Sequence, residues 1–351
     1  MNVTAAQLTE QLAAILRAWG SREADIGPTA RVLVSADLRG IESHGTTMMS
    51  LYDEHRRSGK VKMDRDITGV RESPVTALVD GGGGMGHAPG VRAMDLAIAK
   101  CKANGLAAVG VRNSNHYGAA GVYAMMAAEQ GLVGLSTTST HTPSVVPTFA
   151  RVSMFGTHPI AFAAPAKRNR AFVLDMASST VAVGKLKIAA MQRKPVPAGW
   201  ALDPAGEPVT DPVKGLEYRR MTPLGGTRVQ GSHKGYGLAA MVEILSSLIP
   251  GAATPALHGA AAPVNVGHFF MAIDPKAFRG EGEFEEQLDE LIDTLHAAPR
   301  ADPAQPVLVA GDPEAACEEQ RKKTGIPLYS DQVELLQRLA RECGAPFLLA
   351  N

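Results

Sequence analysis

One stretch decides how this chain is interpreted: Ala36-Asp37-Leu38-Arg39-Gly40-Ile41-Glu42-Ser43-His44-Gly45, a helical run that ends in Ser-His-Gly. An imidazole titrates near neutral pH, and a neighbouring glycine lets another molecule approach the backbone. His44 is therefore a candidate for proton transfer. Ser-His-Gly alone is a weak signal, but the chain carries two further motifs of the same kind, Asn115-His116-Tyr117-Gly118 and His233-Lys234-Gly235-Tyr236-Gly237.

The composition is that of a soluble globular protein. The 351 residues are 45% hydrophobic and 20% charged, and Lys+Arg 35 balance Asp+Glu 35. A neutral chain gives no reason to expect a nucleic acid or an acidic membrane surface as partner. The longest apolar run, residues 236–253, contains Glu243 and two serines, so we expect no membrane span.

Cysteine and histidine spacing argues against a disulfide framework and against a metal site. The three cysteines are far apart and odd in number, which favours reduced thiols and a cytoplasmic location. The ten histidines form no H-x-x-x-H pair and the cysteines no C-x-x-C pair, so we expect no bound metal.

Hydrophobic periodicity divides the chain into a helical beginning and an alternating α/β body. Residues 1 to about 60 read as helical, with Thr4 as an N-cap and Pro28 opening a second helix. From residue 75, strands and helices alternate. The expected strands are 75–79, 106–111, 133–137, 160–164, 172–175, 268–273 and 307–310, and the expected later helices are 91–103, 119–129, 236–248, 283–296 and 330–342.

The glycine-rich run at residues 81–86 contains a G-x-G-x-x-G pattern between a strand and a helix. That context can hold a pyrophosphate at a helix N-terminus. The next strand, however, ends in Val111-Arg112 and offers no acidic residue for a ribose, and four consecutive glycines match the pattern easily. We therefore interpret the run as a turn without a ligand role.

Motifs along nearly the whole chain resemble the type-2 malate/L-lactate dehydrogenase family, which includes ureidoglycolate, sulfolactate and diketogulonate oxidoreductases and some cyclic-imine reductases. The matching pieces occur in one order, at residues 36–45, 114–121, 155–157, 159–162, 174–177, 184–185, 233–238, 267–270 and 325–328.

The resemblance implies an α/β fold that is not a Rossmann fold. It implies a distinctive nicotinamide-binding region, expected at residues 75–302, and a helical domain built from both chain ends, expected at residues 1–74 plus 303–351. It also implies NAD or NADP as cofactor and a homodimer with the active site near the subunit interface.

The resemblance also assigns roles by motif match. His44 or His116 is the expected acid/base, with the choice left open, and Lys185 is a candidate to stabilise the alkoxide. The substrate side matches Ser43, Tyr52, Thr138 and Thr157. The cofactor side matches His116, Asp175, Met176, Ala177, Lys234, Gly311 and Asp312.

The chain departs from the family pattern at Met48, where members usually carry an arginine that can clamp a substrate carboxylate. His158 stands in place of the asparagine of Gly-Thr-Asn-Pro, and Asp312 in place of the glutamate of Pro-Gly-Glu. The expected function is hydride transfer between NAD(P) and a small 2-hydroxy acid or 2-oxo acid. Two alternatives stay open: a cyclic-imine carboxylate reductase, and an inactive member that only binds nicotinamide.

Overall fold

A computed structural model describes residues 1–259 and 263–349. Its centre is a seven-stranded sheet in the order β2-β3-β4-β10-β5-β6-β7, in which β3 and β4 are parallel and all other neighbours antiparallel. The strands are β2 (Thr68–Glu72), β3 (Thr76–Asp80), β4 (Leu106–Ser114), β10 (Val266–Ile273), β5 (Val133–Thr138), β6 (Ile160–Ala164) and β7 (Phe172–Met176).

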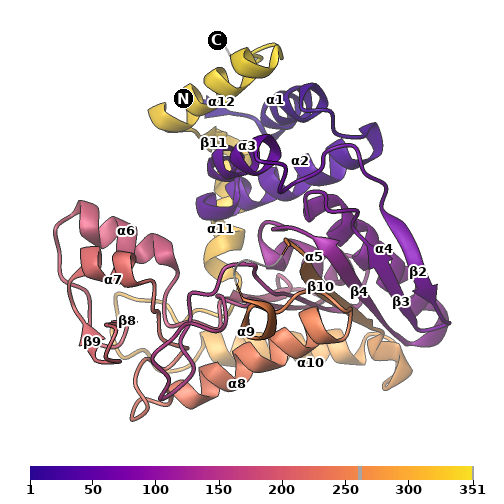
Figure 1. The fold of residues 1–351 in the computed structure, drawn as a ribbon. Coiled ribbons are helices and arrows are strands. Elements are labelled where there is room, and N and C mark those ends of the chain that lie inside the picture. Colours follow the sequence, from indigo (N-terminus) through magenta and orange to yellow (C-terminus); the bar gives the residue numbers. More distant parts are fainter. Residues whose placement is uncertain (260–262, 350–351) are drawn as a thin grey trace.

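Helices cover both faces of the sheet (Figure 1). On one face lie α4 (His87–Asn104) and α5 (Ala120–Ala128), whose alanines and methionines form the main core with β4, β10 and β6. On the other lies α8 (Ser232–Glu243), continued by a π-helical turn at Ile244–Leu248 that packs on β10. The helix α10 (Glu283–His296) contacts the turn between β6 and β7, where its Asp289 accepts the backbone N–H groups of Arg168 and Asn169.

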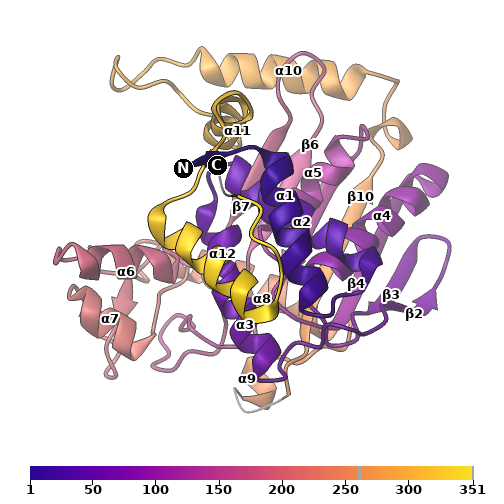
Figure 2. The ribbon, with the colours of Figure 1, turned by 90° about the horizontal axis from the view of Figure 1, so that it is seen from above.

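The two chain ends form one helical cluster above α4 and α5, and Figure 2 shows them side by side. Its helices are α1 (Ala5–Ala18), α2 (Glu23–Leu38), α3 (Met49–Arg57), α11 (Asp312–Thr324) and α12 (Ser330–Cys343). Strand β1 (Asn2–Val3) pairs with β11 (Ile326–Pro327), and α1 packs on both α2 and α12 around a second core. The sheet itself begins at Thr68, inside the range 1–74 assigned by sequence to the helical domain.

A small lobe projects to one side of the sheet in both views. It contains α6 (Val183–Met191), β8 (Ala201–Leu202), β9 (Pro208–Val209) and α7 (Pro212–Tyr218). The lobe has its own core of Val145, Leu186, Val196 and Met221. α9 (Pro255–His258) lies after α8 in the chain.

The structure corrects several sequence predictions. Pro28 lies inside α2, which begins at Glu23, because Glu23 and Asp25 in the first turn suit the positive end of a helix dipole. The segment 307–310 is not a strand: the backbone link to β7 is one hydrogen bond, from Val173 N–H to the carbonyl of Ala310. Sequence reasoning did not find β2, α6, α7 or α11. The N-cap at Thr4 is confirmed, with a full capping box.

Candidate active site

Most of the expected site residues gather along one edge of the sheet because the strand registers align their ends there. Ser114 at the end of β4 pairs with Val266, His268 pairs with Thr138, and Ile160 pairs with both Thr137 and Met176. The ends of β4, β5 and β7 and the starts of β10 and β6 therefore share this edge. His116, Thr138, Thr157 and the segment 175–177 all lie in or next to it.

His44 comes to this edge from the helical cluster, in two short 3-10 turns between α2 and α3. Buried Asp37 of α2 fixes this loop: its carboxylate accepts the N–H of Thr46 at 2.9 Å, and a Cβ on Gly45 would lie 1.9 Å from an Asp37 oxygen. Only glycine fits there. The C-terminal segment supports the same loop, because Arg321 pairs with Glu42 and Gln332 donates to the Thr46 hydroxyl.

Two histidine rings face each other at the site. The ring centroids of His44 and His116 are 5.5 Å apart, and both residues are half-buried. Nδ1 of His44 lies 2.9 Å from the hydroxyl of Ser43. Ser43 is exposed, so its hydroxyl is free to rotate and to donate or accept.

A third histidine, His87, lies behind His116 and is linked to it through Tyr52. The Tyr52 hydroxyl lies 2.7 Å from Nδ1 of His116 and 3.3 Å from Nε2 of His87, and both Tyr52 and His87 are fully buried. Sequence reasoning expected Tyr52 here but missed His87. The available signal was its position, directly after Gly86 at the start of α4.

The hydrogen-bond pattern selects one tautomer of His116. If Tyr52 donates to Nδ1 of His116 and accepts from Nε2–H of His87, the buried Nδ1 of His87, which has no partner, is an unpaired acceptor. The reverse arrangement would bury an unpaired N–H, which costs more. The N–H of Gly118 also points at Nδ1 of His116, at 3.4 Å. His116 is therefore protonated at Nε2.

Burial keeps these imidazoles neutral at neutral pH. Desolvation lowers the pKa of His44, lowers that of His116 well below its usual value, and lowers that of His87 to about 3. Of the two facing rings, His44 is the one whose Nδ1 partner can reorganise, so it can change protonation state without breaking a buried network.

The end of β7 is tied to the start of α5 and to the loop before β6. Asp175 accepts the N–H of Gly121 at 2.7 Å, and desolvation by surrounding elements raises its pKa to about 6, although solvent still reaches part of the residue. Ser178 donates both its N–H, at 2.8 Å, and its hydroxyl, at 3.0 Å, to the carbonyl of Thr157. Met176 and Ala177, between these anchors, are half-buried.

Thr138 is at the expected edge, but its hydroxyl is engaged inside the protein. It donates to the carbonyls of Ser139 and Gly267 and accepts from Nδ1–H of His268 at 2.6 Å. His268 is fully buried, accepts from Ser114 at 2.8 Å and stacks on Tyr117. Thr138 therefore braces β5 against β10 and does not offer a free hydroxyl to a substrate.

The two candidate lysines are exposed, and no described contact joins either of them to the histidines. Lys185 is on α6 in the side lobe, and no described contact joins it to His44 or His116. Lys234 is at the start of α8, where a Cβ on Gly235 would lie 2.4 Å from backbone atoms of Leu224. The glycine after Lys234 thus permits close helix packing.

Gly311 and Asp312 lie at the start of β7, at the opposite end of that strand from Ala177. A Cβ on Gly311 would touch Val173. The Asp312 carboxylate accepts from Nε2 of His296 at 2.7 Å and from Val309 N–H at 2.8 Å. These bonds, opposed by desolvation, lower its pKa. Both contacts of this carboxylate are made within the protein, where they stabilise the loop before α11.

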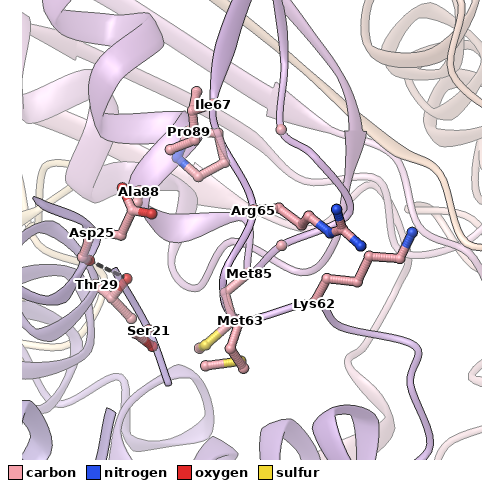
Figure 3. A pocket seen from close by; sticks show the side chains of 12 residues that line it. Ser21, Asp25, Thr29, Lys62, Met63, Arg65, Ile67, Met85, Ala88 and Pro89 are labelled. Carbon is pink, nitrogen blue, oxygen red and sulfur yellow. Dashed lines mark hydrogen bonds between the residues drawn. The ribbon is translucent and has the colours of Figure 1, made fainter. Parts of the chain in front are cut away.

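The glycine-rich turn is built for close packing. Asn115 donates to the carbonyls of Gly83 and Gly84, and the N–H of Gly86 donates to the carbonyl of His116 at 3.1 Å. The α4 N-terminus is thus covered by backbone. Figure 3 shows a hollow beside the turn, between Asp25, Lys62 and Met85, whose volume of about 20 Å³ suits a single water.

A larger cavity of about 390 Å³ lies between α2, α5 and α11, on the side of Gly311. Its cations are already paired, Arg31 with Glu129, Arg39 with Glu318 and Arg170 with Glu319. Neither His44 nor His116 lines it.

Met48, which stands where an arginine clamp was expected, packs against the core of the helical cluster. Within the described ranges, no group of three or more His, Cys, Asp or Glu side chains is arranged to hold a metal ion. Nor does any helix there reach the length and apolarity needed to cross a membrane.

Comparison with known proteins points in one direction. The family model described as malate/L-lactate dehydrogenase matches residues 3–337. The malate dehydrogenase of Pyrococcus horikoshii is 39% identical over 333 residues, which cover 94% of this chain and 92% of that protein.

Solved structures agree. The malate dehydrogenase of Entamoeba histolytica superposes with a TM-score of 0.92 at 31% identity, covering 99% of both chains. The delta1-piperideine-2-carboxylate reductase of Pseudomonas syringae superposes with a TM-score of 0.85 at 30% identity, covering 97% of this chain and 100% of that one.

Proposed function

The chain belongs to the malate/L-lactate dehydrogenase family, and from this premise we propose that it transfers hydride between a nicotinamide cofactor and a small 2-hydroxy acid or its 2-oxo acid. The observation that carries the proposal is the facing pair of imidazoles, His44 and His116, on the sheet edge where β7 ends in 175–177. A 2-hydroxy acid needs a base for its hydroxyl proton as hydride leaves carbon.

His44 is the acid/base in this proposal and His116 the hydrogen-bond donor. Neutral His44 accepts the hydroxyl proton during oxidation and returns it during reduction, while the exposed Ser43 hydroxyl adjusts to either form. His116, held with its proton on Nε2, donates to the substrate oxygen and stabilises the developing negative charge.

The residues at the sheet edge fit a nicotinamide. Small residues line the start of α5, Asp175 is exposed at the end of β7, and Met176 and Ala177 are half-buried beside it. We propose that Asp175, Met176, Ala177 and the exposed Lys234 hold the cofactor, NAD or NADP, which supplies the hydride acceptor. Gly311 would border its more distant part, whereas the engaged Asp312 carboxylate would not contact it.

We further propose a cytoplasmic homodimer. The three cysteines are free, as reduced thiols would be. Met241, Ile244 and Leu248 are 39%, 50% and 52% exposed and follow each other at helical spacing along α8 and its π-helical turn. An apolar stripe of this kind favours a second copy of the chain. Ile244→Glu should produce a monomer in light scattering, and a dimeric variant would argue against this face.

A dimer would also give Lys185 a role, since this lysine is exposed and no described contact joins it to His44 within one chain. We propose that it reaches the site across the subunit interface and stabilises the alkoxide. Mixing His44→Ala with Lys185→Ala subunits should then restore part of the activity that each variant lacks alone. No recovery after subunit exchange would place both residues in one subunit's site or remove Lys185 from it.

The direct test is a substrate panel read by the absorbance of reduced nicotinamide, with both NAD and NADP. We expect turnover on malate, lactate or related 2-hydroxy acids, and a drop of at least ~100-fold for His44→Ala. Near-normal turnover of that variant would transfer the acid/base role to His116.

The likeness to the delta1-piperideine-2-carboxylate reductase keeps imine reduction as a second candidate. Faster turnover of cyclic-imine carboxylates than of 2-oxo acids would favour it. Tight cofactor binding with no turnover on either class would instead indicate an inactive, nicotinamide-binding member of the family.

A further inference from the structure

His158, on the loop before β6, and Glu243, at the end of α8, form a pair that no step of the proposed reaction uses. Nε2 of His158 contacts a carboxylate oxygen of Glu243, and Nδ1 lies 3.0 Å from the carbonyl of Gly156. The side chains of His158 and Glu243 are 0% and 6% exposed. His158 also has a positive φ of 37°, which few residues other than glycine and asparagine adopt.

The geometry fixes the protons of this pair. The carbonyl of Gly156 can only accept, so Nδ1 of His158 carries a proton. Nε2 then faces the carboxylate, and the contact needs a second proton between them. Desolvation alone would raise the pKa of Glu243, but the hydrogen bond from His158 outweighs it and lowers this pKa, so Glu243 is the anion of the pair.

The pair holds in place a backbone connection that leads to the cofactor segment. One residue before His158, the carbonyl of Thr157 accepts both hydrogen bonds of Ser178, which directly follows Ala177. The carbonyl of Ser178 in turn accepts the N–H of Leu224 at 2.9 Å, and Leu224 packs on Gly235 of α8. α8 is thus joined to this loop system at its start through Leu224 and at its end through Glu243.

We propose that His158 and Glu243 are positioning residues: their hydrogen bond clamps α8 to the Thr157 loop and so orients the segment 175–177, together with Lys234, for the nicotinamide cofactor. This inference rests on the proposed function for its cofactor part. Neither side chain needs to touch the cofactor or the substrate.

Two variants separate the hydrogen bond from generic damage. Glu243→Gln keeps the contact, because neutral His158 can accept from the Gln amide at Nε2 while Nδ1–H still donates to Gly156. Glu243→Leu removes the contact and leaves His158 buried without its partner, which costs stability as the loss of one member of a buried pair does. Gln11→Ala is the control: Gln11 is a buried amide bonded to residues 346 and 348 in the helical cluster, remote from the clamp.

The first measurement, hydrogen exchange followed by NMR, needs no cofactor. We expect the amides of Ser178 and Leu224 to exchange at least about tenfold faster in Glu243→Leu and near the wild-type rate in Glu243→Gln and Gln11→Ala. Unchanged exchange in Glu243→Leu, or equal acceleration in Gln11→Ala, would overturn the clamp.

The second measurement is a fluorescence titration with NADH and with NADPH. Glu243→Leu should raise the dissociation constant about tenfold and Glu243→Gln by no more than about twofold. Equal affinity of Glu243→Leu and the wild type, or equal loss in both variants, would refute the positioning role. A wild type that binds neither nucleotide would count against the proposed function, and the exchange rates would still decide the clamp.

Discussion

Replacing Tyr52 with Phe tests the proposed roles of the two facing histidines, with His44 as acid/base and His116 as hydrogen-bond donor. The substitution removes only the hydroxyl that joins His87 to His116 and leaves the buried ring in place, so no cavity forms. His116 then loses its donor at Nδ1, keeping the long contact from Gly118, and the Nε2–H of His87 loses its acceptor.

The expected size follows from these contacts. One buried donor without an acceptor costs about 1–3 kcal/mol of unfolding free energy. The 2.7 Å hydrogen bond that selects the tautomer of His116 contributes about 1 kcal/mol, which corresponds to roughly a fivefold fall in kcat if His116 must donate from Nε2. The loss should remain far smaller than the ~100-fold expected for His44→Ala.

The assay combines steady-state kinetics, chemical denaturation and the ring ¹⁵N shifts of His116. Tyr117→Phe is the matched control, because it also removes a buried tyrosine hydroxyl, which bonds Ser136 at 3.1 Å, without touching His116. It should lower stability while kcat and the His116 shifts stay unchanged. A Tyr52→Phe enzyme with wild-type kcat and wild-type His116 shifts would refute the reasoning.

Three further outcomes are expected. Burial lowers the pKa of His44, so kcat/KM for oxidation, which needs the neutral ring, should fall only at acidic pH, below the usual histidine range. Reduction needs the charged ring and should slow as pH rises. Parallel pH profiles in both directions would contradict this assignment. Desolvation raises the pKa of Asp37 from 3.8 to about 7, so the unfolded state releases this proton at lower pH than the folded state does. The free energy of unfolding should therefore decline as pH rises through that interval, by about 4 kcal/mol at most. Asp37→Asn should flatten this pH dependence in denaturation curves, and an unchanged slope would exclude Asp37 as its source. Gly235→Ala places a methyl group against the Leu224 backbone and should lower the free energy of unfolding by about 1–3 kcal/mol in chemical denaturation. A variant with the wild-type midpoint would contradict this and would mean that α8 can shift to make room.

Local signals in the sequence predicted much of the sheet and its flanking helices. Alternating apolar runs located six of its seven strands, and helical periodicity placed α10 at Glu283–His296 with both of its ends. Short two-residue strands and the helices of the side lobe were missed because they carry little periodic pattern. The segment 307–310 was wrongly predicted to be a strand because its residues are apolar, although its backbone forms no ladder of hydrogen bonds with a neighbouring strand.

The site divides in the same way. His44, His116 and Asp175 stand in short motifs and could be named from sequence. The contacts that support them could not, although Tyr52 itself was named, because the partners are distant in the chain: Tyr52 meets His87 across 35 residues, and His158 meets Glu243 across 85. Which hydroxyls and carboxylates are already engaged, as at Thr138 and Asp312, also depends on contacts that only the folded chain provides.

The loop that carries His44 is braced by residues near the far end of the chain, Arg321 and Gln332, and β1 finds its partner only in β11. His44 is therefore translated well before the residues that brace its loop. Chains that stop before Arg321 would lack both braces of the loop that carries His44, the proposed acid/base, so they should lose activity even though every sheet-edge residue is still present.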